Sequence, residues 1–328
     1  MGLLLSIFLG FVPMFLFSWF IYGLDRYEKE PKALLGGAFL WGAVVAAGAA
    51  FIINTTFGVG IYLTTGSENG ADFATGSFVA PVVEECLKGL AVLLVFIFFY
   101  REFDSVLDGI IYATVTALGF AATENSFYIY TQGFLEKGSP GLAMMVFIRV
   151  ILVGWQHPYY TAFFGIGLAI ARLNRNTLLK LFATIAGITV GIVAHSFHNT
   201  LLTIITGVTA LVVGTTFDWT GWIIMFIFIL LMIYRDGQLL VGNLQEEVRL
   251  GMITGEQYLT ACSANPQGWA RFTAFLHRRY QITNRFYQLC GELAHKKNPL
   301  ARVGDEGGNT AIIIHLQEEL KKLSSLVA

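Results

Sequence analysis

The chain has 328 residues, of which 55% are hydrophobic and 13% are charged. Soluble domains carry about 25% charged residues, so this composition excludes a soluble globular protein and a disordered chain. The formal net charge is −1, which excludes nucleic-acid binding through an overall basic surface. The sequence therefore predicts a membrane protein, with the lipid bilayer as a partner and no nucleic acid.

Apolar stretches long enough to cross a bilayer recur through the first 234 residues. A span needs ~20 residues, and only helices satisfy their own backbone in lipid. We expect an all-α, polytopic membrane helix bundle of about seven to eight spans, the eighth arising if the second or fifth stretch breaks or re-enters. The predicted spans are residues 2–24, 33–63, 75–100, 107–130, 141–171, 181–207 and 208–234.

The first stretch is expected to be a retained anchor, because no basic residues precede it and no small-residue cleavage site follows it. Basic residues predict the orientation. Seven Lys and Arg residues lie in one set of connections, at 25–32, 101–106 and 172–180. The alternate connections, 64–74, 131–140 and 208–220, hold only Lys137. With seven spans in the cell membrane, the N-terminus is extracytoplasmic and the C-terminus is cytoplasmic.

Composition changes at residue 235, which divides the chain into a transmembrane core, 1–234, and a cytosolic tail, 235–328. The tail holds 11 of the 21 Lys and Arg residues. We expect a small module of short helices, one of them at 309–325, where Ile312, Ile313, Leu316, Leu320 and Leu323 recur at helical spacing. Thr254 and Gln257 fit a capping box, and residues 304–308 fit a flexible joint. The tail either binds a partner and regulates, or only packs on the core.

Three cysteines, Cys86, Cys262 and Cys290, are too few for a disulfide framework. The sequence contains no CxxC pair, so a thiolate zinc site is excluded as well.

Ionisable side chains inside the predicted spans are the candidate functional residues, because a charge in the bilayer costs several kcal/mol, of the order of 3 kcal/mol or more. They lie in the third to sixth spans: Glu84, Glu85, Lys88, Glu124, Arg149, His157, His195 and His198, with the polar Asn125 and Asn199 beside them. Three of the six histidines are in this set.

Their depths in the membrane follow from a helical rise of ~1.5 Å per residue. Glu84 lies ~12 Å, Glu124 ~9 Å and His198 ~14 Å from the outer ends of their spans. His157 lies deeper, ~22 Å along its span, although Pro158 is expected to kink that helix. Most of these groups therefore meet at one level in the extracytoplasmic half of the membrane.

Angular spacing also favours an internal site. Two sets each share one face of a helix: Glu84, Glu85 and Lys88 on the third span, and His195, His198 and Asn199 on the sixth. Polar residues that share one helix face are typical of a common internal pocket and not of residues scattered over the lipid-facing surface.

The chemistry that this set supports is peptide hydrolysis. A carboxylate can deprotonate water, and imidazoles can hold a metal or donate to an oxyanion. A three-ligand zinc set can be assembled from Glu85, Glu124, His157, His195 and His198. No HExxH motif is present, so zinc stays one possibility and a metal-free mechanism the other.

Other interpretations of the same residues are open. Glu84, Glu85 and Lys88 could form an ion-pair strut, Glu124 with Asn125 could clamp two helices, and the histidines could be satisfied core residues. Arg149 is expected to pair with a carboxylate or to extend outward.

Two further functions compete with hydrolysis. A proton- or ion-coupled transporter also places Glu and His in spans, but it needs such groups at depths that reach both faces. The cytoplasmic halves of the third and sixth spans, 91–99 and 181–193, contain almost none. A non-catalytic membrane receptor or immunity protein is supported mainly by the polar tail.

Four motifs resemble those of the PrsW family of intramembrane proteases, in the same order. Glu84-Glu85-Cys86-Leu87-Lys88 resembles the EExxK motif, and Phe120 to Glu124, followed by Asn125, resembles FxxxE. His195 to Asn199 resembles the last, histidine-bearing motif, and His157 lies where the family has another histidine. Residues 25–31 resemble the juxtamembrane DxYEKEP stretch. The likeness covers the membrane region and only loosely the tail.

The resemblance implies a site-1 type protease that cleaves a single-pass anti-sigma factor. It also implies distant kinship with CAAX-processing and bacteriocin-immunity membrane proteases, whose motif is EExxxR. The family is grouped with metallopeptidases, whereas the CAAX relatives resemble metal-free glutamate proteases.

We expect Glu85 to be the principal base and Glu84 its partner, held by Lys88. The expected metal ligands or oxyanion donors are Glu124, His157, His195 and His198, with Asn199 assisting.

Overall fold

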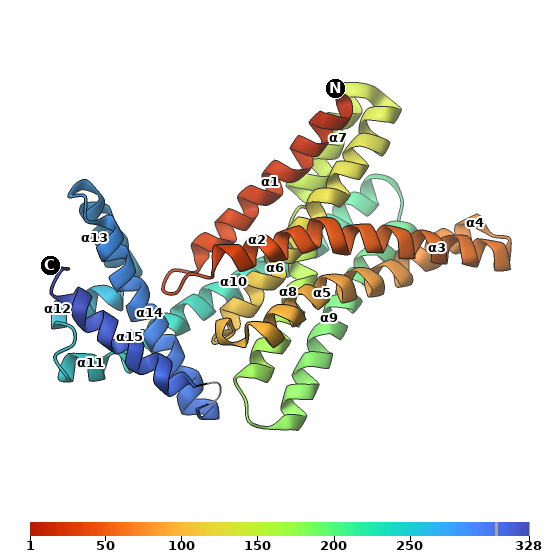
Figure 1. Ribbon diagram of the computed structural model, residues 1–328. Coiled ribbons are helices and arrows are strands. Elements are labelled where there is room, and N and C mark those ends of the chain that lie inside the picture. The colour runs from red at the N-terminus through yellow and green to blue at the C-terminus, as the bar shows by residue number, and fades with distance from the viewer. Residues whose placement is uncertain (306–307, 328) are drawn as a thin grey trace.

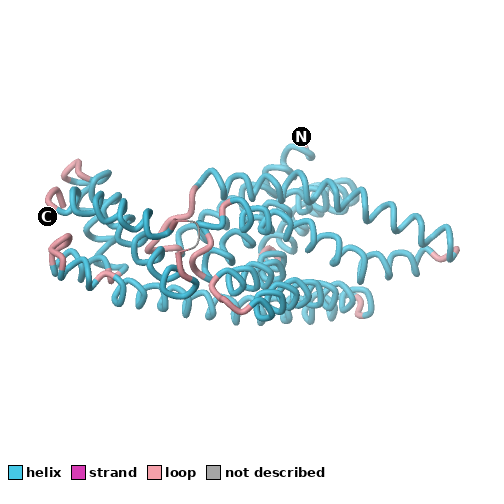
Figure 2. The backbone as a smooth tube through the Cα atoms, turned by 60° about the horizontal axis from the view of Figure 1, so that its bottom comes forward, coloured by secondary structure: helices cyan, strands magenta, loops and turns pink. Residues whose placement is uncertain are grey.

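The computed structural model describes residues 1–305 and 308–327, and these residues form helices and no strands (Figures 1 and 2). The predicted all-α membrane bundle is therefore confirmed. A helical tail projects from one end of the bundle and lies at the left of Figure 1.

The first half of the membrane region alternates α-helices with π-helical segments. It contains α1 (Gly2–Leu24), α2 (Lys32–Leu40), η1 (Trp41–Ala46), α3 (Ala47–Thr65), α4 (Glu68–Ala74), η2 (Thr75–Val79) and α5 (Ala80–Phe98). A 3₁₀ turn, η3 (Tyr100–Glu102), follows. The second half contains α6 (Val106–Tyr128), η4 (Ile129–Leu135), α7 (Glu136–Val146), η5 (Phe147–Leu152), α8 (Gln156–Arg172), α9 (Thr177–Ile204) and α10 (Gly207–Asn243).

By length and composition, five helical stretches of the described chain could cross a membrane: Gly2–Leu24, Lys32–Thr65, Val106–Arg172, Thr177–Ile204 and Gly207–Arg249. This number differs from the predicted seven to eight for two reasons. The predicted third span, α5, carries three charged residues. The 67-residue stretch from Val106 contains α6, α7 and α8 and therefore includes two of the predicted spans. The chain turns back between them at Gly138, where φ is +63°.

Helix α6 is the centre of the bundle, with 19 of its 23 residues buried. It packs against α1, α2, α5 and α8. The contact with α8 depends on two glycines, because a Cβ on Gly109 would overlap the backbone oxygen of Gly165 and the reverse also holds. Small residues allow membrane helices to approach this closely.

Helix α10 continues without a break into the tail. Its 37 residues span about 55 Å at 1.5 Å per residue, well beyond a ~30 Å hydrocarbon core. The predicted boundary between residues 234 and 235 falls inside this helix, so it marks a change of composition and not of backbone direction. The division into a core of residues 1–234 and a tail of residues 235–328 stays a prediction.

The tail contains α11 (Gln245–Arg249), α12 (Gly255–Ala261), α13 (Ala264–Leu276), α14 (Tyr280–Val303) and α15 (Asn309–Ser324). It has a hydrophobic core of its own, to which α14 contributes Phe286, Leu289 and Leu293. The helix predicted at 309–325 is confirmed, and Ile313, Leu316 and Leu320 are its buried face. The Thr254–Gln257 capping box is confirmed, whereas residues 306–307 of the predicted joint lie outside the described residues.

The tail docks on the loop that follows α1. A Cβ on Gly291 would overlap the backbone oxygen of Tyr27. A polar group that we call the juxtamembrane cluster (Glu28, Asp104, His295 and Lys296) lies beside this contact. The imidazole Nδ1 of His295 lies 3.2 Å from Asp104 and 3.4 Å from Glu28, and Lys296 pairs with Asp104.

The charges of this cluster depend on one another. Burial alone lowers the pKa of His295, but the hydrogen bond to Asp104 and the negative charges of Glu28 and Asp104 raise it well above its ordinary value. Burial raises the pKa of Asp104, but Lys296 and His295 outweigh burial and hold it below its usual range. Burial and the charge of Asp104 raise the pKa of Glu28 well above its ordinary value, so the folded protein favours a cationic His295 paired with an ionised Asp104.

We predict that Gly109→Ala lowers the melting temperature of the detergent-purified protein. Overpacking costs about 1–3 kcal/mol, and here the added methyl meets backbone and not a flexible side chain. The control is Gly48→Ala, which adds the same methyl group to a helix position with nothing within 4 Å. Equal melting temperatures for the two variants would contradict the close α6–α8 contact.

We predict that His295→Gln destabilises the protein in a pH-dependent way. A raised pKa in the folded state stabilises it fully below the unfolded value of 6.5, and this contribution declines as the pH rises from 6.5 through the folded pKa. The difference in melting temperature between wild type and variant should therefore be larger at pH 6 than at pH 9. The opposite order would show that His295 is neutral in the folded state.

Candidate functional site

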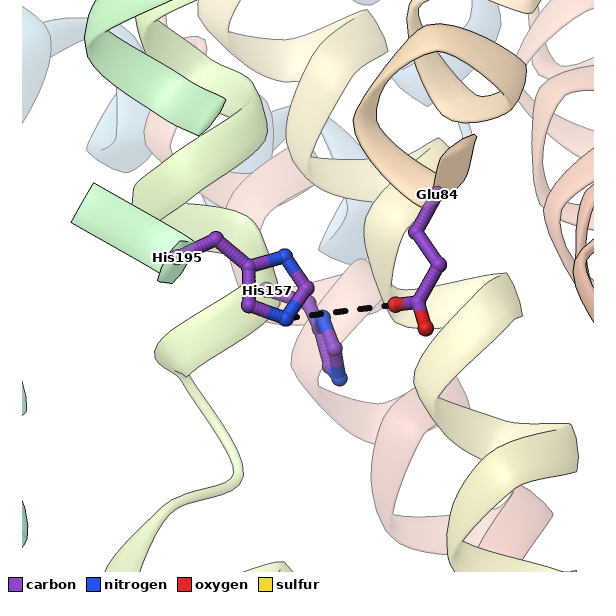
Figure 3. Close-up of side chains that lie close together, drawn as sticks. All are labelled: Glu84, His157 and His195. Atoms are coloured by element: carbon purple, nitrogen blue, oxygen red, sulfur yellow. Dashed lines mark ion pairs between the residues drawn. The ribbon is translucent and has the colours of Figure 1, made fainter. Parts of the chain in front are cut away.

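Helices α5, α8 and α9 bring three buried side chains together inside the bundle. Glu84, His157 and His195 each offer one ligand atom, and these atoms lie within 4.8 Å of one another. Figure 3 shows the three side chains converging from their separate helices, with Glu84 Oε2 3.9 Å from His195 Nε2. We call these residues the central triad. They are 3–7% exposed, so water reaches them only through the protein interior.

Glu84 keeps one carboxylate oxygen without a hydrogen bond. Its Oε1 accepts a hydrogen bond of 3.4 Å from Asn54 Nδ2, whereas Oε2 is buried and has no hydrogen-bond partner. A buried oxygen of this kind costs about 1–3 kcal/mol. Oε2 of Glu84 is therefore the atom best placed to bind a ligand or a cation.

Glu85 is held much more tightly than its neighbour. Its Oε1 lies 2.7 Å from Lys88 Nζ and 3.0 Å from His195 Nδ1, and its Oε2 accepts a hydrogen bond of 2.7 Å from Thr161. Lys88 lies farther from Glu84, at 3.7 Å. The expected order is therefore reversed: Lys88 pairs more closely with the proposed base, Glu85, than with Glu84.

Lys88 is fully buried and supplies the positive charge of the site. Besides the two glutamates, its ammonium lies 3.1 Å from His157 Nδ1 and 4.2 Å from the centre of the Phe120 ring. Phe120 also packs edge-on against the His157 ring. The aromatic residue of the FxxxE motif therefore lines the site, without a polar group of its own.

Hydrogen bonds orient both imidazoles of the central triad. An ammonium only donates, so His157 Nδ1 accepts from Lys88 and its Nε2 carries the proton toward Glu124 Oε2, 2.7 Å away. His195 directs Nδ1 to Glu85, which leaves the lone pair on Nε2 facing Glu84. Backing of a ring nitrogen by a carboxylate is typical of histidines that bind zinc.

The donor set therefore fits a zinc ion, with one carboxylate oxygen and one nitrogen from each histidine. Glu85 and Glu124 are the supporting carboxylates. Because His157 Nδ1 also faces Lys88, a bound cation would require Lys88 to give up this contact while it keeps its ion pair with Glu85.

The charge of Glu124 is neutralised by an arginine side chain from η5. Glu124 forms an ion pair with Arg149, whose Nε donates to Asn125 Oδ1 at 3.1 Å. The guanidinium also lies over the Tyr128 ring, 4.4 Å from its centre. The expected pairing of Arg149 with a carboxylate is confirmed. Glu124 reaches the central triad only through His157, as a partner of a ligand.

His198 and Asn199, predicted with the site, lie outside the central triad. His198 Nδ1 is 3.0 Å from Asp218 Oδ2, and Asp218 Oδ1 accepts a hydrogen bond of 2.7 Å from Tyr160. Asn199 donates instead to the backbone oxygen of Gly76, 2.8 Å away. His198 lies one turn along α9 from His195 and on the same face, but its imidazole pairs with Asp218 of α10, so it does not join the central triad.

Sequence reasoning missed four residues that touch the site: Asn54, Tyr160, Thr161 and Asp218. The Tyr160 ring stacks on His195 with ring centres 4.8 Å apart, so Asp218 acts on the central triad through Tyr160. Asp218 could have been found from the sequence, because it is a single acidic residue in an apolar stretch. Neutral Asn, Thr and Tyr carry no comparable signal.

The expected position of His157 is wrong. The predicted fifth span is broken at residues 153–155, and α8 begins at Gln156, so Pro158 lies in the first turn of α8. Proline is tolerated there because the missing N–H would have no helical partner. The ~22 Å depth counted from residue 142 assumed one continuous helix. With the break, His157 stands at the start of α8 and level with Glu84 and His195.

Comparison with known proteins gives one family. The profile described as PrsW family intramembrane metalloprotease matches residues 30–233, which is more than half of the chain and contains Glu84, His157 and His195 with the residues described around them. No solved structure matches.

Curated relatives carry the same name. Protease PrsW of Clostridioides difficile is 33% identical over 125 residues, 38% of this chain and 50% of the relative. Protease PrsW of Geobacillus kaustophilus is 31% identical over 114 residues, 35% of this chain and 47% of the relative. Protease PrsW of Bacillus subtilis is 24% identical over 194 residues, 59% of this chain and 81% of the relative. The chain spans about half the length of the first two.

We predict that Lys88→Met destabilises the protein by about 3–5 kcal/mol, because removing one partner leaves buried carboxylates without their cation. Adding Glu85→Gln should recover part of the loss, since it removes one unpaired charge. Chemical or thermal unfolding of both variants measures the effect. If the double variant is the less stable of the two, Lys88 and Glu85 do not neutralise each other.

Proposed function

The chain belongs to the PrsW family of intramembrane metalloproteases, and we propose that it is a multi-pass membrane endopeptidase that hydrolyses a peptide bond in single-pass membrane proteins. The observation that carries the proposal is the central triad, in which each histidine is backed by a carboxylate. A strut of ion pairs would need neither a buried Glu84 oxygen that makes no hydrogen bond nor two oriented imidazoles.

In the proposed mechanism, Glu84, His157 and His195 would hold a zinc ion. When bound, that ion would supply Lewis acidity and make a water molecule easier to deprotonate. Glu124 holds His157 and Glu85 holds His195 in the required tautomers, and Tyr160 supports the His195 ring from its face.

Proton transfer is assigned to Glu85. Its Oε2 accepts only the Thr161 hydrogen bond and keeps a second lone pair, while Lys88 forms an ion pair with Oε1. The proton of the attacking water passes to Glu85 as the oxygen bonds to the scissile carbonyl carbon. The same proton then passes to the amine nitrogen as the C–N bond breaks.

The substrate class and the orientation are also proposals. An anti-sigma factor is a single-pass protein of the required kind, and the family resemblance supports it. The distribution of basic residues supports an extracytoplasmic N-terminus and a cytoplasmic tail. The site then opens toward the extracytoplasmic half of the membrane.

We predict that some site variants lose cleavage but keep zinc, whereas others lose both. Glu85→Gln should retain about one zinc per chain but lose about 10²–10⁴-fold in cleavage rate, the usual contribution of a general base. His195→Ala should lose both zinc and cleavage. His198→Ala is the matched control on the same helix and should retain zinc. Elemental analysis of purified protein and cleavage of a co-expressed, tagged anti-sigma factor are the measurements.

Two outcomes would overturn parts of this assignment. Full activity after exhaustive chelation would favour a metal-free glutamate protease. Undiminished cleavage by Glu85→Gln would remove Glu85 from the mechanism.

A further inference from the structure

A cleft of about 410 Å³ lies between α3 and the short helix α4. Its volume is within the ~300–1,000 Å³ that ligand sites occupy. We call it the α3–α4 cleft, and it is lined by Asn54, Thr55, Gly58, Val59, Tyr62, Glu68, Ala71, Asp72 and Thr75. At Gly58 the walls approach closely, since a Cβ there would lie 3.3 Å from Thr75 Oγ1.

The inner end of this cleft reaches the central triad. Asn54 lines the cleft, and its Nδ2 donates to Glu84 Oε1 at 3.4 Å. One residue therefore borders the cleft on one side and contacts the proposed zinc ligand on the other. A molecule in the cleft is adjacent to the site without crossing another helix.

Hydrogen-bonding atoms of the cleft lack partners within the protein. Asn54 Oδ1 and Thr75 Oγ1, both from lining residues, are buried and make no hydrogen bond. Beyond the lining, Oε2 of Glu84 also makes no hydrogen bond. Unpaired buried polar atoms are uncommon and costly. An extended polypeptide offers backbone N–H donors that match these acceptors, as peptide-binding clefts require.

The charges of the cleft are all negative. Glu68 and Asp72 are the only charged residues between positions 33 and 83, and both line this cleft. Both are exposed, and they lie in the connection predicted to be extracytoplasmic. A peptide segment with Lys or Arg is the complementary partner, and charges at a rim act mainly on the rate of association.

We propose that the α3–α4 cleft receives the extracytoplasmic segment that directly follows the transmembrane helix of the substrate. That segment binds in an extended form, with a Lys or Arg beside Glu68 and Asp72, and leads the scissile bond past Asn54 to the central triad. This proposal rests on the proposed function, and it adds the part of the substrate that is recognised and its charge.

Filling the cleft is the first test. Gly58→Leu should lower cleavage of the tagged anti-sigma factor at least ten-fold, because the added side chain occupies the narrow point. Gly60→Leu, two positions along α3 with nothing within 4 Å, is the matched control and should cleave like wild type. Equal cleavage by both variants would overturn the proposal.

Charge exchange is the second test. With an anti-sigma factor that carries two Lys residues just outside its transmembrane helix, Glu68→Lys with Asp72→Lys should cleave about five-fold or more slowly, the upper range for exposed ion pairs. Changing the two substrate Lys residues to Glu should restore cleavage by this variant and slow the wild type. Glu136→Gln, an exposed acid outside the cleft, should have no effect. Loss without rescue would contradict charge recognition.

A third measurement separates this proposal from the proposed function. In the inactive Glu85→Gln background, a photo-crosslinking residue at Thr55, in the cleft, should capture the anti-sigma factor through its extracytoplasmic segment. The same residue at Thr56, next along α3 but outside the lining, should not. Crosslinking at Thr55 without any wild-type cleavage would refute the hydrolase and retain the cleft. Cleavage with no difference between the two positions would refute the cleft.

Discussion

The ammonium group of Lys88 is the interaction on which the membrane site depends. It is fully buried and lies between the two glutamates of its own helix, while its remaining contacts are His157 and the face of Phe120. Carboxylates at this depth would be prohibitively costly without a cation close by. Because the charge of Lys88 is delivered mainly to Glu85, the neighbouring Glu84 keeps an oxygen available. One asymmetric ion pair therefore gives two adjacent, chemically identical residues different environments.

Much of this arrangement was predictable from the sequence. Charged residues in apolar stretches identified Glu84, Glu85 and Lys88, and helical spacing assigned them to one face. Opposite span directions and similar depths grouped His198 with them, and helical spacing added His195 on the same face. These inferences succeed because lipid makes every buried charge expensive, so that a charge in a span is informative by itself. The same rule favoured His198 equally, and spacing could not show that Asp218 lies opposite it.

Other features depend on contacts between distant segments that sequence patterns do not record. The sequence allowed a break in the fifth stretch but did not place it at residues 153–155, between η5 and α8. Thr161 and Tyr160 are ordinary residues of a membrane helix, and their roles appear only when α8 lies against α5 and α9. The close approach of α6 and α8 requires glycine at positions 109 and 165. Composition alone does not distinguish these two glycines from the others in the chain.

Helix α10 joins regions that would otherwise be far apart. It carries Asp218, which contacts Tyr160 and His198 beside the central triad, and it ends with Leu240 in the core of the tail. Rigid secondary elements of this kind can carry energetic coupling between sites. Since no break separates the two residues, a rotation of the tail about the axis of α10 would turn Asp218 through a comparable angle. The tail and the membrane site are thus joined by one continuous helix, and a rotation of the tail would reach the Tyr160 ring that stacks on His195 through Asp218.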